Sequence, residues 1–203
     1  VEQQALLQFL AVGDAPGLSL SDLCYLRGVL AADLDTLPVI ANHDPEEVRY
    51  NVFQALQYLA DWLCGNGCVA LPATLRSARG EKIFVRIMDD LATTERSRWE
   101  LWAEVQHGRV SGAAFAAILA EELAFLRAGA DTAERRIQVR WQGTAARFYP
   151  IAGRLLRQLV LSPEPPEFVT ELALPFTFPC VRDAEDPWAA AQALCPGKFT
   201  GGP

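Results

Sequence analysis

Two adjacent acids, Asp89 and Asp90, are the residues of this sequence best suited to chemistry. They stand where a segment without helical periodicity gives way to a helix predicted over residues 90–107. Backbone N–H groups at a helix start can fix the direction of a carboxylate, and a carboxylate so held can act as a general base. Asp is also an ordinary N-cap residue that favours the positive end of the helix dipole. The pattern alone leaves both interpretations open.

Other familiar reactive motifs are missing from the sequence. It contains no glycine-rich phosphate loop ending in Lys-Ser/Thr and no Gly-x-Ser-x-Gly elbow. His43 and His107 each adjoin a predicted helix end, which favours a structural role for both. We therefore expect no histidine-based catalyst.

The five cysteines are odd in number and widely spaced, at Cys24, Cys64, Cys68, Cys180 and Cys195. A disulfide framework in a small secreted domain would be denser, so we expect reduced thiols in a cytoplasmic protein. Cys64 and Cys68 are four residues apart, but neither histidine supplies a second pair of ligands. The sequence therefore predicts no metal site within this chain.

The clearest helix start is Asp44-Pro45-Glu46-Glu47, where Asp44 caps the helix, Pro45 suits its first position and Glu47 completes a capping box. An apolar stripe follows at Val48, Val52, Leu56, Leu59 and Leu63. The helix is predicted to end at Gly65-Asn66-Gly67.

Most of the remaining chain also has helical periodicity. Helices are predicted at residues 2–10, 21–34, 90–107, 111–127, 144–161, 165–174 and, after the cap Asp186, 188–194. Residues 69–88 break this pattern, and residues 83–87 favour an extended segment. The predicted fold is all-α, an antiparallel bundle of five to seven helices with a short irregular or extended insertion.

Composition narrows the classes of partner. The 203 residues are 51% hydrophobic and 21% charged, which is typical of a globular domain. The net charge of −7 disfavours binding to the phosphate backbone of a nucleic acid. No apolar run reaches the roughly 20 residues that span a bilayer, and no signal peptide is visible after Val1. We expect a cytoplasmic protein that binds neither nucleic acid nor membrane.

Several segments, in order, resemble the C-terminal helical domain of malate synthases. That family carries Tyr-Leu-x-x-Trp-Leu, a Gly-Asn-Gly-Cys-Val turn, Met-Glu-Asp-x-Ala-Thr-x-Glu-x-Ser-Arg, then Trp and His-Gly. The matching segments here are residues 58–63, 65–69 and 88–98, followed by Trp102 and residues 107–108, with a weaker match at 167–175. The resemblance covers roughly residues 43–176. It implies an N-terminal helical arm at 1–42, the family domain at 43–180 and an irregular tail at 181–203.

The resemblance implies a role for Asp90 as the general base that takes a proton from the methyl group of acetyl-CoA. The enolate then attacks glyoxylate, and hydrolysis of the malyl thioester gives malate and CoA. Asp89 stands where the family has Glu, which keeps the charge. Cys68 matches a family cysteine near the active-site end of the domain, although a small thiol after a helix stop is equally natural there. Supporting hydrogen bonds are expected from Thr93, Glu95, Ser97 and Arg98.

A basic cluster lies in the segment before Met88, which is longer than in the shorter malate synthases. Its members are Arg76, Arg79, Lys82 and Arg86. On an acidic chain, these cations are candidates to meet the phosphates of CoA. A solvated loop is the alternative interpretation.

The family's Mg²⁺ ligands, its glyoxylate-binding arginine and most of its CoA pocket belong to a TIM barrel. A barrel needs about 250 residues, and only 42 precede His43. Mg²⁺ is therefore expected only with a barrel supplied by another chain or by a part of the protein outside these residues, and the expected partners are a barrel subunit, a second copy of this chain and an acyl-CoA substrate. Two alternatives stay open: a repurposed acid/base enzyme acting on another CoA thioester, and a non-catalytic binding or assembly module on the same scaffold.

Overall fold

The structure is a computed structural model that describes residues 41–76, 82–129, 141, 143 and 145–199, with the backbone alone at 69–76 and 82–89. The helices predicted at 2–10 and 21–34 lie outside the described residues. The chain divides into two compact units. One comprises residues 40–71 and 87–203 and holds the helices described below; the other comprises residues 1–39 and 72–86.

Helix α3 (Pro45–Leu63) is the central element of the larger unit, because it packs against three other helices, α4, α5 and α6. Its predicted stripe is buried, and so is every residue from Asn51 to Asp61. Oδ1 of Asp44 accepts the N–H of Glu46 at 2.9 Å and so caps the helix as predicted. The predicted capping box does not form, because the N–H of Asp44 donates to the carbonyl of Ala41 instead of to Glu47.

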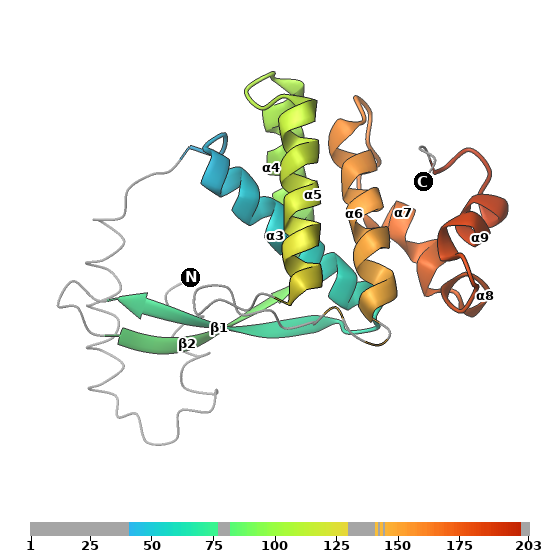
Figure 1. The fold of residues 1–203 in the computed structure, drawn as a ribbon, viewed down its shortest axis with the longest axis horizontal. Coiled ribbons are helices and arrows are strands. Elements are labelled where there is room, and N and C mark those ends of the chain that lie inside the picture. Colours follow the sequence, from blue (N-terminus) through green and yellow to red (C-terminus); the bar gives the residue numbers. More distant parts are fainter. Residues whose placement is uncertain (1–40, 77–81, 130–140, 142, 144, 200–203) are drawn as a thin grey trace. The chain divides into compact units, whose positions relative to one another are not determined.

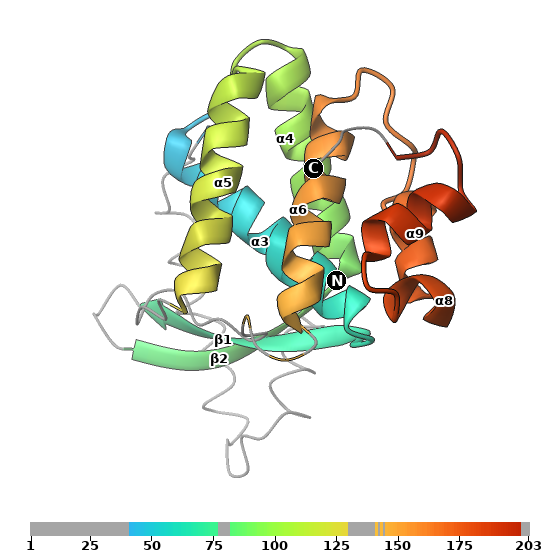
Figure 2. The ribbon, with the colours of Figure 1, turned by 45° about the vertical axis from the view of Figure 1, so that its right-hand side comes forward.

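Three further helices build the bundle: α4 (Leu91–Gln106), α5 (Gly112–Ala128) and α6 (Ala145–Leu161). They run up, down and up, and α3 crosses them obliquely (Figures 1 and 2). Helices α5 and α6 approach closely at Gly153, where a Cβ would come within 2.8 Å of Leu123. The antiparallel all-α bundle is therefore confirmed, with its core formed by the apolar faces that α3, α5 and α6 bury.

The insertion between α3 and α4 is a two-stranded hairpin of β1 (Cys68–Arg76) and β2 (Lys82–Asp90). The predicted extended segment at 83–87 lies within β2. Five residues join the strands, too few for a parallel crossover, so the strands are antiparallel. The first residue of β1 and the last residue of β2 therefore lie at the same end of the hairpin.

The C-terminal part consists of short helices: α7 (Thr170–Ala173), η1 (Leu174–Thr177), α8 (Pro179–Arg182) and α9 (Pro187–Leu194). The helix predicted at 165–174 begins later than expected, at Thr170, because the carbonyl of Glu167 and the N–H of Val169 are hydrogen-bonded to the side chains of Arg98 and Glu95. The tail is ordered by α9, which Asp186 caps as predicted, and by a cluster of aromatic rings at Phe176, Trp188 and Phe199.

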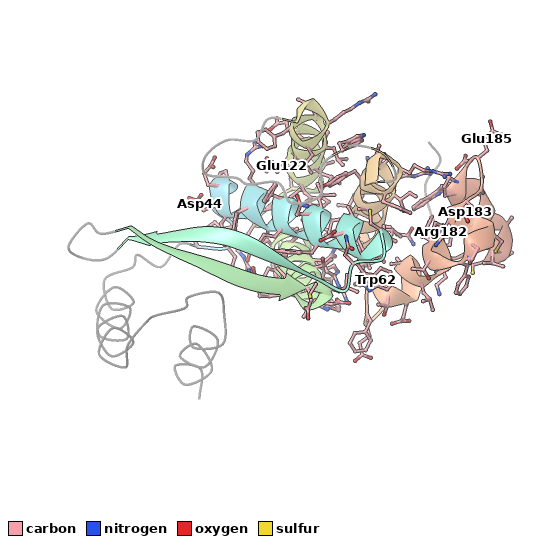
Figure 3. The ribbon with its side chains drawn as sticks, turned by 90° about the horizontal axis from the view of Figure 1, so that it is seen from below. Asp44, Trp62, Glu122, Arg182, Asp183 and Glu185 are labelled. Carbon is pink, nitrogen blue, oxygen red and sulfur yellow. The ribbon has the colours of Figure 1, made fainter. Side chains whose placement is uncertain are left out.

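An ion pair secures the turn between α4 and α5. The carboxylate of Glu104 is buried and accepts hydrogen bonds from Nε and Nη2 of Arg109 at 2.5 and 2.9 Å. Nδ1 of His43 lies 3.8 Å from the same carboxylate. On α3, Arg49 binds Glu121 and the buried Glu122 of α5 at 2.6 and 2.9 Å; Glu122 is labelled in Figure 3. Charged pairs thus join the ends of the helices around the apolar core.

Acid should weaken the Glu104–Arg109 pair. Hydrogen bonding to Arg109 holds the pKa of Glu104 below its usual range. A depressed folded-state pKa contributes stability above the unfolded pKa and loses it as the pH falls through the folded value. We expect Glu104→Gln to be less stable than the parent at pH 7 and to converge with it as the pH falls below the usual pKa range of a carboxyl, as measured by urea unfolding at a series of pH values. A difference that does not change with pH would contradict the ion-pair account.

Candidate functional site

Asp90 ends β2 and caps α4, so one residue joins the hairpin to the helix. Its backbone is extended (φ −140°, ψ −162°), and its Oδ1 accepts the N–H of Ala92 at 2.8 Å. The side chain is exposed to solvent. The chain thus presents a carboxylate whose direction is fixed by the helix backbone and whose surface remains accessible to a ligand.

Cys68 opens β1 and lies at the same end of the hairpin as Asp90. Its thiol is exposed, and the four described cysteines, at 64, 68, 180 and 195, carry no disulfide. The hairpin therefore brings together two of the predicted site residues, which are 22 positions apart in the sequence.

The second turn of α4 is tied to the chain just before α7 by a buried charged pair. Nε of Arg98 donates to Oε2 of Glu95 at 2.7 Å, and the Arg98 side chain is 0% exposed. Arg98 Nη2 also donates to the carbonyl of Glu167, while Oε1 of Glu95 accepts the N–H of Val169. The guanidinium lies 3.8 Å over the ring of Trp99. We call this group the Glu95–Arg98 clamp.

Burial lowers the pKa of Arg98, and the hydrogen bond and charge of Glu95 oppose that shift. An arginine keeps its charge in proteins, so its burial depends on Glu95 and a backbone carbonyl, which accept hydrogen bonds from Nε and Nη2, while the buried Nη1 has no hydrogen-bond partner. The clamp is therefore a costly arrangement that fixes residues 167–169 against the helix beginning at Asp90.

The other side of α4 faces α3 through polar groups. Ser97 Oγ and Arg96 Nη2 both donate to Oε1 of Gln54, at 3.5 and 3.2 Å, and Thr94 Oγ1 donates to the carbonyl of Ala55 at 3.4 Å. These bonds, added to the clamp, hold α4 on two sides. Thr93, half-buried in the first turn of α4, completes the set of predicted supporting residues. Their action on Asp90 stays a prediction.

The turn leading to Cys68 is anchored by Asp61. Asn66 Nδ2 donates to Asp61 Oδ1 at 2.6 Å, and Gly65 takes the positive φ of 97° that ends α3. Burial raises the pKa of Asp61, which the bond from Asn66 opposes. Burial, together with the charge of Asp61, raises the pKa of Cys64 to about 11, so this thiol is protonated at neutral pH.

Four of the remaining predicted residues belong to the hairpin. Asp89 is the penultimate residue of β2, Arg76 ends β1, and Lys82 and Arg86 belong to β2. Arg79 lies outside the described residues. A role for these four cations in binding CoA stays a prediction.

No three His, Cys, Asp or Glu side chains in the described part of the chain come close enough to hold a metal ion. None of the described helices is long and apolar enough to cross a membrane.

Sequence reasoning singled out Glu95 and Arg98 but not their partners. The acceptor and donor that complete the clamp are backbone groups of Glu167 and Val169, about 70 residues away, and main-chain partners leave no compositional signal. The weak family match at 167–175 was the one available indication that this segment lies near the motif.

The fold and this geometry define a class: a helical domain that presents an exposed carboxylate at the junction of a hairpin and a helix. The family model for the C-terminal part of malate synthase matches residues 42–175. The chain therefore belongs to the malate synthase family, through the family's C-terminal domain.

Relatives with curated descriptions agree with this assignment. Malate synthase A of Escherichia coli is 28% identical over 148 residues, which cover 70% of this chain and 24% of that protein. Malate synthase of Oryza sativa is 29% identical over 145 residues, which cover 70% of this chain and 23% of that protein. A shorter match, 36% over 63 residues, joins the chain to malate synthase of Myxococcus xanthus. The chain spans about a quarter of the length of the first two relatives. No solved structure matches it significantly.

Removing Arg98 should destabilise the domain far more than removing a neighbouring arginine. Arg98→Met leaves Glu95 without its buried partner and should cost about 3 kcal/mol. Arg96→Met, on the same helix, removes a side chain that is 57% exposed and should cost less than about 1 kcal/mol. Urea unfolding at pH 7 measures both losses. If both variants lost the same free energy of unfolding, the clamp would stabilise the domain no more than an ordinary surface ion pair does.

Asp61 should respond to pH in the opposite sense from Glu104. A carboxyl whose folded pKa is raised destabilises the fold when ionised, and this penalty disappears as the pH falls through the folded value. Asp61→Asn can keep the bond to Asn66 while removing the charge. We expect it to equal or exceed the parent in stability at pH 7, with the gap closing towards pH 4. A variant markedly less stable than the parent at pH 7 would refute this.

Proposed function

We propose that this chain supplies the general base of a malate-synthase-like Claisen condensation, and that Asp90 is that base. In the proposed reaction Asp90 takes a proton from the methyl group of acetyl-CoA. The resulting enolate carbon bonds to the aldehyde carbon of glyoxylate, and water then releases CoA from the malyl thioester. The proposal rests on one observation: Asp90, within the family motif, is an exposed carboxylate with one oxygen fixed at 2.8 Å by a helix N–H.

The geometry suits this chemistry. A general base contributes most when its direction is fixed before substrate arrives, and the bond from Ala92 orients one oxygen while the exposed side chain leaves the carboxylate accessible. The clamp and the bonds to Gln54 hold the helix that carries Asp90. In this proposal Thr93, Glu95, Ser97 and Arg98 are positioning residues.

The remaining chemistry is assigned to a partner. Stabilising the enolate oxyanion is the larger part of such catalysis, and the family places this task on a Mg²⁺ site in the barrel. The residues described here offer no cluster that fits the metal. In our proposal a barrel-bearing chain contributes Mg²⁺ and the glyoxylate site, while Arg76, Arg79, Lys82 and Arg86 attract the phosphates of CoA.

The test is Asp90→Asn, assayed for malate formation from acetyl-CoA, glyoxylate and Mg²⁺ in a preparation that retains the chain's native partners. Loss of a general base should lower kcat by about 10²–10⁴-fold, with little change in the KM for acetyl-CoA. Calorimetric titration of the purified chain with acetyl-CoA, with and without glyoxylate and Mg²⁺, measures the binding that survives in this chain alone.

Asp44→Asn is the matched control. Asp44 also caps a helix through its Oδ1, at 2.9 Å from the N–H of Glu46, and it is also exposed. Asn is a good N-cap, so both variants should keep their stability. If the two variants had the same kcat, Asp90 would not be the base. Absence of turnover and of acetyl-CoA binding in every preparation would favour the non-catalytic module.

A further inference from the structure

The C-terminal segment 163–181 exposes an unusual amount of apolar surface. The described residues include five large apolar side chains with high exposure, and three lie in this segment: Phe168 (54%), Leu174 (48%) and Phe178 (40%). They belong to, or flank, α7, η1 and α8, and η1 packs against both α7 and α8. Exposed aromatic residues gathered in one short stretch indicate a contact surface.

Phe168 is exposed on a backbone that is held on both sides. Its N–H donates to Oε1 of Glu171 at 3.0 Å, and its carbonyl accepts the N–H of Glu171 at 3.1 Å. The neighbouring residues Glu167 and Val169 are bound by the Glu95–Arg98 clamp. An aromatic side chain on a fixed backbone loses less conformational entropy on binding than one on a mobile loop, which is the property of a good interface anchor.

The charge on this segment is of one sign. Residues 163–181 contain Glu164, Glu167 and Glu171, all exposed, and no Lys, Arg or His. The next stretch adds Asp183 and Glu185, which lie in the connection between α8 and α9 (Figure 3). Two cations adjoin this connection: Arg182 is paired with Asp183 at 2.8 Å, and Arg147 of α6 donates to the carbonyl of Ala184. Arg98 behind the segment is paired with Glu95. The apolar side chains therefore stand among carboxylates.

We propose that segment 163–181 is the docking surface for a partner protein whose matching face is apolar at its centre and lined by Lys and Arg. This inference rests on the proposed function, in which the partner is the chain carrying the rest of the malate-synthase-like site. The clamp joins this segment to the second turn of the helix that Asp90 starts, so a partner seated on Phe168 lies beside the Asp90 end of α4.

The same charges disfavour a second copy of this chain as the occupant. A two-fold interface would bring each segment against its own image, and thus set carboxylates against carboxylates. The whole chain carries a net charge of −7, so no long-range attraction between copies offsets this repulsion. Apolar burial favours contact, and charge selects a basic partner over self-association.

The experiment places a photo-crosslinking phenylalanine analogue at position 168 of the full chain, in the host that naturally makes it, and identifies the linked chain by mass spectrometry. Position 50 is the matched control, because Tyr50 is also aromatic and 45% exposed but lies on α3. We expect a link at 168, and none at 50, to a chain that matches malate synthases outside the part found here. Its linked peptides should be rich in Lys and Arg.

The partner so identified then allows affinity measurements. Phe168→Ala should weaken binding about 30-fold, as loss of an aromatic anchor does. The charge reversal Glu164→Lys with Glu167→Lys should slow association about tenfold at low salt and have little effect at high salt. Tyr50→Ala should leave the affinity within about twofold.

The other crosslinking outcomes overturn the docking surface. It is wrong if position 168 links only to a second copy, links to nothing, or links no more specifically than position 50. A partner captured through position 50 alone, with turnover still lost in Asp90→Asn, would refute the surface while leaving the proposed function intact. A partner captured at 168, with turnover unchanged in Asp90→Asn, would refute the proposed function while leaving the docking surface intact.

Discussion

The burial of Arg98 is the constraint on which the rest of the structure depends. A guanidinium with no exposed surface depends on acceptors supplied by the fold, and Arg98 has two of them: the carboxylate of Glu95 on the same helix and the carbonyl of Glu167. Removing a charge from water is expensive, so the C-terminal segment is fixed in place as long as the arginine is buried. The ion pair lies within α4, and its hydrogen bonds to the backbone at Glu167 and Val169 join the bundle to the segment that leads into the short C-terminal helices.

Buried polar side chains also lie within the bundle core. Helix α3 is enclosed by three other helices, yet Asn51, Gln54, Gln57 and Asp61 are buried along its length. Gln54 meets Arg96 and Ser97, and Asp61 meets Asn66, so polar groups set the register of α3 against α4 and of the turn against α3. Apolar packing alone tolerates small slips between helices, whereas hydrogen bonds do not. The carboxylate at the start of α4 depends on this register.

Much of this arrangement follows from local sequence. The helices starting at Asp44, Asp90, Ser111 and Asp186 were predicted from caps and periodicity, because those signals act within a few residues. The hairpin was foreseen only as an extended segment, since pairing of two strands is a non-local property. The hydrogen bond from Nε1 of Trp102 to the carbonyl of Ser162, at 2.8 Å, also had no sequence signal, because its acceptor is a main-chain group 60 residues away. Exposure of Phe168 had no sequence signal, because the same residue type would suit a core.

The direct junction of β2 and α4 restricts how this domain can change in evolution. Side chains alternate between the two faces of a strand, so inserting or deleting one residue within Lys82–Asp90 would move every later side chain to the opposite face. No linker separates the strand from the helix to absorb such a change. Relatives that retain this hairpin should therefore differ in its length by pairs of residues, or at the connection between the strands, while the spacing from strand to cap stays constant.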